Sequence, residues 1–259
     1  MFYENLDVRM SSNSLQLPTV TPLDFATTAL APHYDNYYAL LIDDCFTASE
    51  CADLIGLADS DWKAAAKSTN FRDCSRIIKD DVVAAKRIYD RVKPFLEDVL
   101  EIEEGGRWWE NVVGKNGGRS GMSKGRWRMA RLNERLRFLK YGEGQYFKPH
   151  CDSSYSTPDK SLKSFLTLHL YLNDSFSPST EDPTQDNVER ELKKGGATRF
   201  WSPEKDQYLD VEPKRGRVLV FQQRMLLHSG EPVEEGVKMT VRSDLMFEWA
   251  PYEKGGGEK

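Results

Sequence analysis

The sequence predicts an α+β protein in which helices come first and an antiparallel β-sandwich or barrel follows. The patterns with helical apolar spacing lie before about residue 100. From Leu132 onward, short β-type runs alternate with turn residues, which is typical of a sandwich or barrel. Hydrophobic residues make up 39% of the 259 residues and aromatic residues 11%, so the chain can build a sizeable core.

The first part of the chain is predicted to support a sheet. Residues 1–36 carry turn formers and little periodicity, and we interpret them as an N-terminal extension that packs on the body. A strand is expected at 38–43, and Thr47 with Glu50 forms a capping-box pattern that predicts a helix start. A second helix is expected at about 80–100, with a kink at Pro94. Residues 37–130 therefore form a predicted support region.

Glycines and tryptophans dominate 105–128, which predicts a long loop with aromatic anchors, including Trp108 and Trp109. Residues 131–250 are the predicted β core, and the support region and core should form one integrated domain. We expect 174–194 to be a mobile insertion and 251–259 a flexible tail. The expected strands of the core cover 135–141, 145–152, 163–172, 197–201, 207–211, 217–221 and 237–248.

Composition limits the class of protein. The formal charge of −5 argues against a surface built to neutralise phosphates, so nucleic acid is a minority hypothesis. No run of 18 apolar residues occurs, so no membrane span is expected, and charges in the first 16 residues argue against a signal peptide. Because the four cysteines show neither zinc-site nor disulfide spacing, we expect buried thiols and a reducing, cytoplasmic location.

His150 and Asp152 suggest a metal site. Alternate residues of a strand face the same side, so both side chains can point inward while Cys151 points away. His228 follows another strand-like run, and an antiparallel partner could bring it to the same cavity. A lone His-x-Asp is common by chance, but the chain has only 4 histidines. Two imidazoles and one carboxylate form the facial triad that binds iron(II) with open positions.

Five ordered segments between Arg135 and Phe247 resemble the iron(II)- and 2-oxoglutarate-dependent dioxygenases of the prolyl 4-hydroxylase type. The resemblance covers somewhat under half of the chain and implies a double-stranded β-helix, a cupin-like jelly roll, preceded by bracing helices. The matching segments are KYGEGQYFKPHCD (140–152), LTLHLYLN (166–173), GGATRF (195–200), PKRGRVLVF (213–221), and His228 with Lys238.

The resemblance also assigns roles. His150, Asp152 and His228 would bind the iron(II), and Lys238 would pair with the C5 carboxylate of 2-oxoglutarate, because a buried ammonium suits a dianion. The residues expected to line the co-substrate pocket are Tyr141, Tyr171 and Thr167. The implied chemistry uses O2 and converts 2-oxoglutarate to succinate and CO2, and ascorbate is a candidate reductant.

Strand alternation predicts further inward side chains. Alternation from Lys238 brings Thr240, Arg242 and Asp244 to the inner face, where the collagen-type and oxygen-sensing relatives tend to carry a tryptophan near the position of Asp244. Arg242 could bind the C1 carboxylate of 2-oxoglutarate or an acidic group of the substrate. With Arg137, these residues form either a site for a small polar or zwitterionic substrate or a structural ion-pair network. His169 is either a substrate contact or a core histidine.

The first functional hypothesis is a soluble oxygenase that oxidises a C–H bond of a small molecule, such as an amino acid or a natural-product intermediate. The runner-up is a protein prolyl hydroxylase. A catalytically silent binding module and a nucleic-acid demethylase, which would use the strip from Arg126 to Lys140, remain the lesser alternatives. The loop at Trp108–Trp109 and the insertion at 174–194 either cover the site or are ordinary surface loops. The pattern predicts no oligomeric state.

Overall fold

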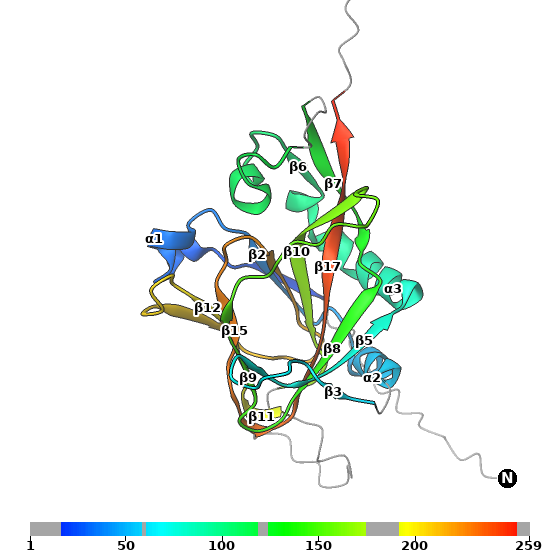
Figure 1. Cartoon of the computed structure of the whole chain (residues 1–259), viewed down its shortest axis with the longest axis vertical. Helices are drawn as coiled ribbons and strands as arrows, with labels where there is room; N and C mark the ends of the chain where they lie inside the picture. The colour runs from blue at the N-terminus through cyan, green and yellow to red at the C-terminus, as the bar shows by residue number, and fades with distance from the viewer. Residues whose placement is uncertain (1–16, 59–60, 119–123, 175–191, 253–259) are drawn as a thin grey trace, which may run out of the picture.

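The computed structural model describes residues 17–58, 61–118, 124–174 and 192–252 (Figure 1). Within these ranges, a 10-stranded and a 5-stranded sheet form the body, and every strand pair in them is antiparallel. This architecture, mostly β with few helices, confirms the α+β prediction of a jelly-roll core with bracing helices.

The larger sheet runs through the centre of the chain's fold. Its main path is β1 (Thr19–Pro22), β2 (Ala39–Asp43), β14 (Val218–Gln222), β10 (Leu162–Tyr171), β17 (Lys238–Pro251), β8 (Arg135–Tyr141), β5 (Ser75–Asp80) and β3 (Lys63–Ala64). Beside the second half of β17 lies β7 (Gly125–Leu132), which also pairs with β6 (Glu101–Glu103).

The smaller sheet faces it across the molecule, as Figure 1 shows for β9, β12 and β15 opposite β8, β10 and β17. Its order is β13 (Tyr208–Val211), β12 (Thr198–Trp201), β15 (His228–Gly230), β9 (Tyr146–His150) and β4 (Arg72–Asp73). A separate pair is formed by β11 (Leu192–Gly195) and β16 (Val233–Gly236). The facing sheets bring residues that are far apart in sequence to one interior.

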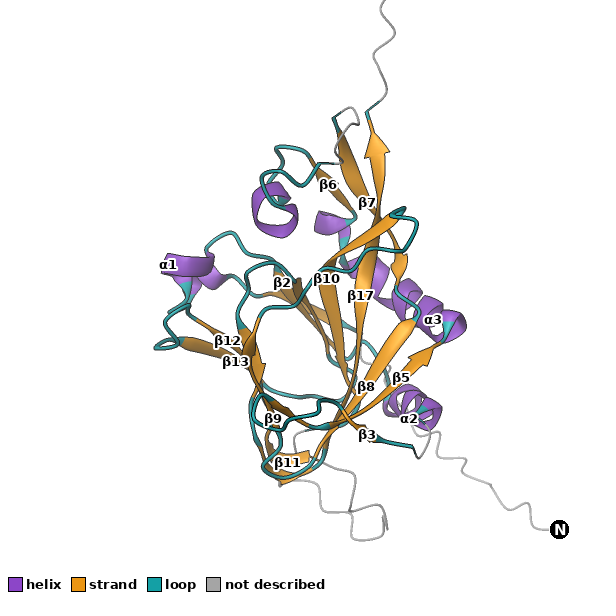
Figure 2. Ribbon diagram, viewed as in Figure 1, coloured by secondary structure: helices purple, strands orange, loops and turns teal. Residues whose placement is uncertain are grey.

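The two long helices lie outside the larger sheet, on the side away from the smaller one (Figure 2). The first, α2 (Ala48–Leu57), begins with the predicted capping box, in which Thr47 accepts from the Glu50 amide and Glu50 accepts from the Thr47 amide. The second, α3 (Val82–Val92), ends earlier than predicted. Because Pro94 cannot continue an α-helix, the chain passes into two short 3₁₀ turns, η2 (Lys93–Phe95) and η3 (Glu97–Val99).

The strand runs predicted for the core agree with β8, β9, β10, β12, β13, β14 and β17 to within a few residues. The long loop predicted at 105–128 is wrong in part, since it contains the π-helical turn η4 (Trp109–Val113) and the start of β7. The missed signal was alternation: Trp127 and Met129 are buried, whereas Arg128 between them is exposed. Trp109 packs against Trp249, so the aromatic anchor itself was correctly expected.

The described part of the N-terminal extension packs on the body. Strand β1 pairs with β2, and the short helices η1 (Phe25–Thr27) and α1 (Ala31–Tyr34) bury Phe25 and Tyr34. Phe25 contacts Phe200 edge to face, with ring centroids 5.5 Å apart. The extension thereby adds to the apolar cluster between the two sheets.

Residues 1–16, nearly all of the predicted insertion and the tail from 253 lie outside the described residues. The predictions of a mobile insertion and a flexible tail therefore stay predictions. In the described ranges, no helix has the length and apolar character needed to cross a bilayer.

Candidate active site

His150, Asp152 and His228 converge on one point between the sheets. His150 ends β9 and is the register partner of His228 on β15, while Asp152 follows two residues later. Their ligand atoms all lie within 4.8 Å of one another. The Nε2 atoms of His150 and His228 are 3.7 Å and 3.8 Å from the two carboxylate oxygens of Asp152. Cys151 is exposed, as the predicted alternation requires.

Hydrogen bonds prepare both imidazoles for metal binding. The Nδ1 atoms of His150 and His228 lie 2.8 Å and 2.9 Å from the carbonyl oxygens of Lys148 and Leu226. An Nδ1–H that donates to a carbonyl leaves the lone pair on Nε2, the atom turned toward the carboxylate. Burial, followed by the charge of His228, lowers the pKa of His150 to about 3, and burial also lowers the pKa of His228. Both rings are therefore neutral at pH 7, which is the form that coordinates a metal.

Asp152 is held by two partners besides the histidines. The Thr167 hydroxyl donates to Asp152 Oδ2 at 2.6 Å, and Arg242 Nη2 lies 2.8 Å from Asp152 Oδ1. Burial opposes ionisation of this carboxyl group, but the charges of Arg242 and His228 outweigh it and lower the pKa of Asp152. The carboxylate is therefore ionised and fixed in place, as a metal ligand must be.

Lys238 is the buried cation that the resemblance implies. Its side chain is 2% exposed, its ammonium donates to the Gly196 carbonyl, and it lies 5.3 Å from the centroid of the Tyr141 ring. Burial lowers the pKa of Lys238 to about 8, against the opposing charge of Glu212. The ammonium is therefore mostly charged at pH 7 and suits a buried carboxylate.

The register explains why these residues meet. On the inner face of the larger sheet, Lys238 is opposite Tyr141, and the next rows contain Thr240 with Tyr171 and Arg242 with His169. Three buried polar atoms in these rows have no hydrogen-bond partner among the described residues: His169 Nε2, Thr240 Oγ1 and Arg242 Nε. Buried polar groups are rarely left unpaired, so this face fits a ligand rich in oxygen atoms.

These side chains line a co-substrate cavity, defined here by Tyr141, His150, His228, Lys238 and Arg242. Its volume is about 40 Å³, close to that of a single water, and its lining residue Arg242 is paired with Asp152. The donor set therefore fits iron(II) and the carboxylates of 2-oxoglutarate.

Other predicted residues lie close by with partners of their own. Tyr171 donates to Thr198 Oγ1 at 2.6 Å, and Thr198, not Tyr171, lines the co-substrate cavity. Asp244 accepts from Arg137 at 2.9 Å and from Gln223 at 3.1 Å. These contacts favour the ion-pair network over direct substrate binding by Arg137 and Asp244. His169 lines the co-substrate cavity and is fully buried, which lowers its pKa.

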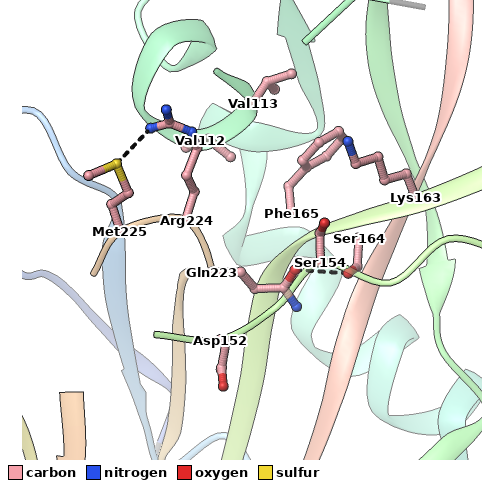
Figure 3. A pocket seen from close by; sticks show the side chains of 10 residues that line it. All are labelled: Val112, Val113, Asp152, Ser154, Lys163, Ser164, Phe165, Gln223, Arg224 and Met225. Atoms are coloured by element: carbon pink, nitrogen blue, oxygen red, sulfur yellow. Dashed lines mark hydrogen bonds between the residues drawn. The ribbon is translucent and has the colours of Figure 1, made fainter. Parts of the chain in front are cut away.

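A second cavity of about 380 Å³, the outer cavity, has Asp152 in its lining (Figure 3). Sequence reasoning missed every other residue of its lining as a site residue. They come from η4, from the segment that follows Asp152, from the start of β10 and from the turn after β14. They are Val112, Val113, Ser154, Lys163, Ser164, Phe165, Gln223, Arg224 and Met225.

The local sequence around the residues of the outer cavity gives only weak signals of a functional site. Gln223 follows the apolar strand β14 yet is 2% exposed, and a buried polar residue at a strand end is the one available pointer to a site. Lys163 and Arg224 look like ordinary surface cations. Arg72, which lines the co-substrate cavity from β4, was missed for the same reason.

Two histidines and one carboxylate lie between the two sheets of this jelly roll. This combination defines the class of mononuclear non-haem iron oxygenases. Residues 136–243 match the family model of the 2OG-Fe(II) oxygenase superfamily. The region from 136 to 243 is therefore the core of a 2OG-Fe(II) oxygenase, with His150, Asp152 and His228 as the iron(II) site and 2-oxoglutarate as co-substrate. The match confirms the family, the enzyme class and these two cofactors.

A solved structure of low sequence identity has the same fold. A prolyl-4-hydroxylase from Pseudomonas putida aligns with a TM-score of 0.50 and 14% identity, covering 89% of this chain and 96% of that one. The 2OG complex of a viral collagen prolyl hydroxylase from Paramecium Bursaria Chlorella virus-1 aligns with a TM-score of 0.46 and 19% identity, over 83% of this chain and 99% of that chain. At the level of sequence, no curated protein matches the chain.

Proposed function

We propose that the chain oxidises an unactivated C–H bond of a small molecule, with release of succinate and CO2. The observation that carries this proposal is the outer cavity, which is bounded by the metal ligand Asp152 and has a volume of about 380 Å³. That volume lies at the lower end of the range typical of small-ligand sites. A substrate bound there would lie against Asp152, one of the three metal ligands.

Once bound, iron(II) and 2-oxoglutarate supply the oxidant, and the protein's residues supply its placement. His150, Asp152 and His228 hold one face of the metal, and Lys238 anchors the distal carboxylate of the co-substrate. Phe165 and Val112 give the outer cavity an apolar wall that limits water near the site of oxidation.

The nucleic-acid hypothesis loses its local support. The first three cations of the strip are paired: Arg126 with Glu101 at 2.8 Å, Arg128 with Glu248 at 2.9 Å, and Arg131 with Glu134. A strip in which most positive charges are neutralised attracts phosphates weakly.

The experiment is a turnover screen of the purified protein with iron(II), 2-oxoglutarate and O2, measuring succinate. The candidates are free amino acids, small organic acids and proline-containing peptides. Stimulation by a small molecule supports the proposal. Stimulation by prolyl peptides alone would replace it with the protein-hydroxylase alternative.

A further inference from the structure

The lining of the outer cavity has an unbalanced charge. Lys163 and Arg224 contribute two cations, and the single acidic residue of the lining is Asp152. Asp152 is committed to the metal position and to Arg242, at 2.8 Å, so it does not neutralise the other two. A positive cavity next to an oxidising centre selects an anionic ligand.

Within residues 17–58, 61–118, 124–174 and 192–252, neither cation has an acidic partner. Among the described residues, no carboxylate lies within ion-pair distance of Lys163 or Arg224. Glu248, the register partner of the residue before Lys163, is bound by Arg128 at 2.9 Å. The one hydrogen bond from the Arg224 side chain goes to the weak acceptor Met225 Sδ, at 3.4 Å. Both cations therefore keep their hydrogen-bonding capacity for a ligand.

Each of the two cations lies against a neighbouring group. The ammonium of Lys163 lies 5.4 Å from the centroid of the Phe165 ring, so its stem follows the apolar wall. Arg224 passes over Gly114 at the end of η4, where a Cβ would lie 3.2 Å from Arg224 Nε. Figure 3 shows the two cations on opposite sides of the view, with Gln223 and Asp152 below them.

The floor between the cations is polar and held rigidly. Ser164 donates to Gln223 Oε1 at 2.8 Å, and Gln223 Nε2 donates to Asp244 Oδ1 at 3.1 Å. Asp244 is held in turn by Arg137 at 2.9 Å. The network at Asp244 therefore orients the floor of the outer cavity, while Val112, Val113 and Phe165 provide the apolar surface.

We propose that the substrate is a small organic acid with an apolar body, whose carboxylate is bound by Lys163 and Arg224 in the outer cavity. This inference rests on the proposed function, because it names the class of substrate for the same site. The acid group is bound by the two cations, and the apolar body extends past Phe165 toward Asp152, where the C–H bond is oxidised.

The test uses the protein loaded with manganese(II) and 2-oxoglutarate, so that the Lys238 anchor is already filled and no turnover occurs. The probes are hexanoate and 3-phenylpropionate, each compared with its neutral amide by calorimetry. The acids should bind about tenfold or more tightly than the amides. Lys163→Gln and Arg224→Gln should each weaken acid binding about tenfold and leave amide binding unchanged.

Lys86→Gln, on the exposed face of α3, is the matched control and should change neither affinity. The inference would be overturned by equal binding of acids and amides, by acid binding that is unchanged in both variants, or by no binding of any acid.

Succinate formation separates the two proposals. If only neutral small molecules stimulate turnover, the proposed function holds and the acid specificity is wrong. If acids bind in a way that depends on Lys163 but no small molecule is turned over, only the proposed function is wrong.

Discussion

Arg242 Nη2 lies 2.8 Å from Asp152 Oδ1, so a carboxylate of the metal triad is paired with a guanidinium of the opposite sheet. Both side chains are shielded from water, with exposures of 19% and 3%. The same Asp152 oxygen is 3.7 Å from His150 Nε2, at the edge of the metal position. Arg242 and the metal therefore neutralise the same buried charge.

Because Arg242 and the metal neutralise the same Asp152 charge, Arg242→Gln should change how strongly metal stabilises the fold. Without metal, the variant leaves a buried carboxylate without its main cation, which costs about 3 kcal/mol of unfolding free energy. Manganese(II) replaces the missing charge, so the rise in melting temperature on adding it should be larger in the variant than in the parent. Arg135→Gln, which breaks an exposed pair with Asp80, is the control and should leave this rise unchanged. An identical rise in Arg242→Gln would show that arginine and metal act independently.

A second prediction concerns Thr167, whose hydroxyl donates to Asp152 Oδ2 at 2.6 Å. Thr167→Val keeps the shape and removes this bond, so the carboxylate is less well oriented and manganese(II) should bind about tenfold more weakly. Thr167→Ser keeps the hydroxyl and should keep most of the affinity. Calorimetric titration of the metal measures both. Unchanged affinity in the valine variant would assign Thr167 to packing alone.

The sequence predicted the parts of this site that depend on local periodicity. Alternation along strands placed His150 with Asp152 and Lys238 with Arg242 on inner faces, and the register of β17 with β8 and β10 agrees. The capping box at Thr47 was equally local. Alternation also exists in β7, but glycines and tryptophans nearby suggested a loop instead.

The outer cavity could not be predicted in the same way. Lys163 lies at the start of β10, Arg224 in the turn after β14, and Val113 at the end of η4, so their meeting depends on packing between distant segments. Thr167 was expected to line the co-substrate pocket, and its bond to Asp152 depends on a side-chain direction that no sequence pattern encodes. Local spacing defines faces of strands, whereas a cavity requires the tertiary fold.

The triad itself is tested by His150→Ala. Loss of one imidazole should abolish both the melting-temperature rise with manganese(II) and the formation of succinate with iron(II). The neighbouring Cys151→Ser alters an exposed side chain on the other face of the chain and should preserve both. Turnover at the parent rate in the alanine variant would refute the assignment of the metal site.

Lys238→Ala tests the anchor for 2-oxoglutarate. Removing a buried ammonium that faces a carboxylate should raise the 2-oxoglutarate concentration for half-maximal succinate formation about a hundredfold. Succinate formation at saturating 2-oxoglutarate should fall much less, because the metal ligands are intact. If the requirement is unchanged, Arg242 must be the principal anchor.

The pH dependence follows from the same lysine. Burial lowers the pKa of Lys238 to about 8, whereas a lysine in the unfolded chain titrates near 10.4. The charged anchor is therefore lost as pH rises through about 8, and kcat/KM for 2-oxoglutarate should fall there. Between about 8 and 10.4 the unfolded state binds more protons, so the contribution of Lys238 to the unfolding free energy rises with pH over the same window.

Lys238→Arg separates this titration from other alkaline effects. A guanidinium stays charged throughout this range, so the fall in kcat/KM above pH 8 should flatten in the variant, even if its absolute value is lower. Succinate assays from pH 6.5 to 9.5 in both proteins provide the measurement. A parallel fall in the arginine variant would assign the alkaline limb to a group other than Lys238.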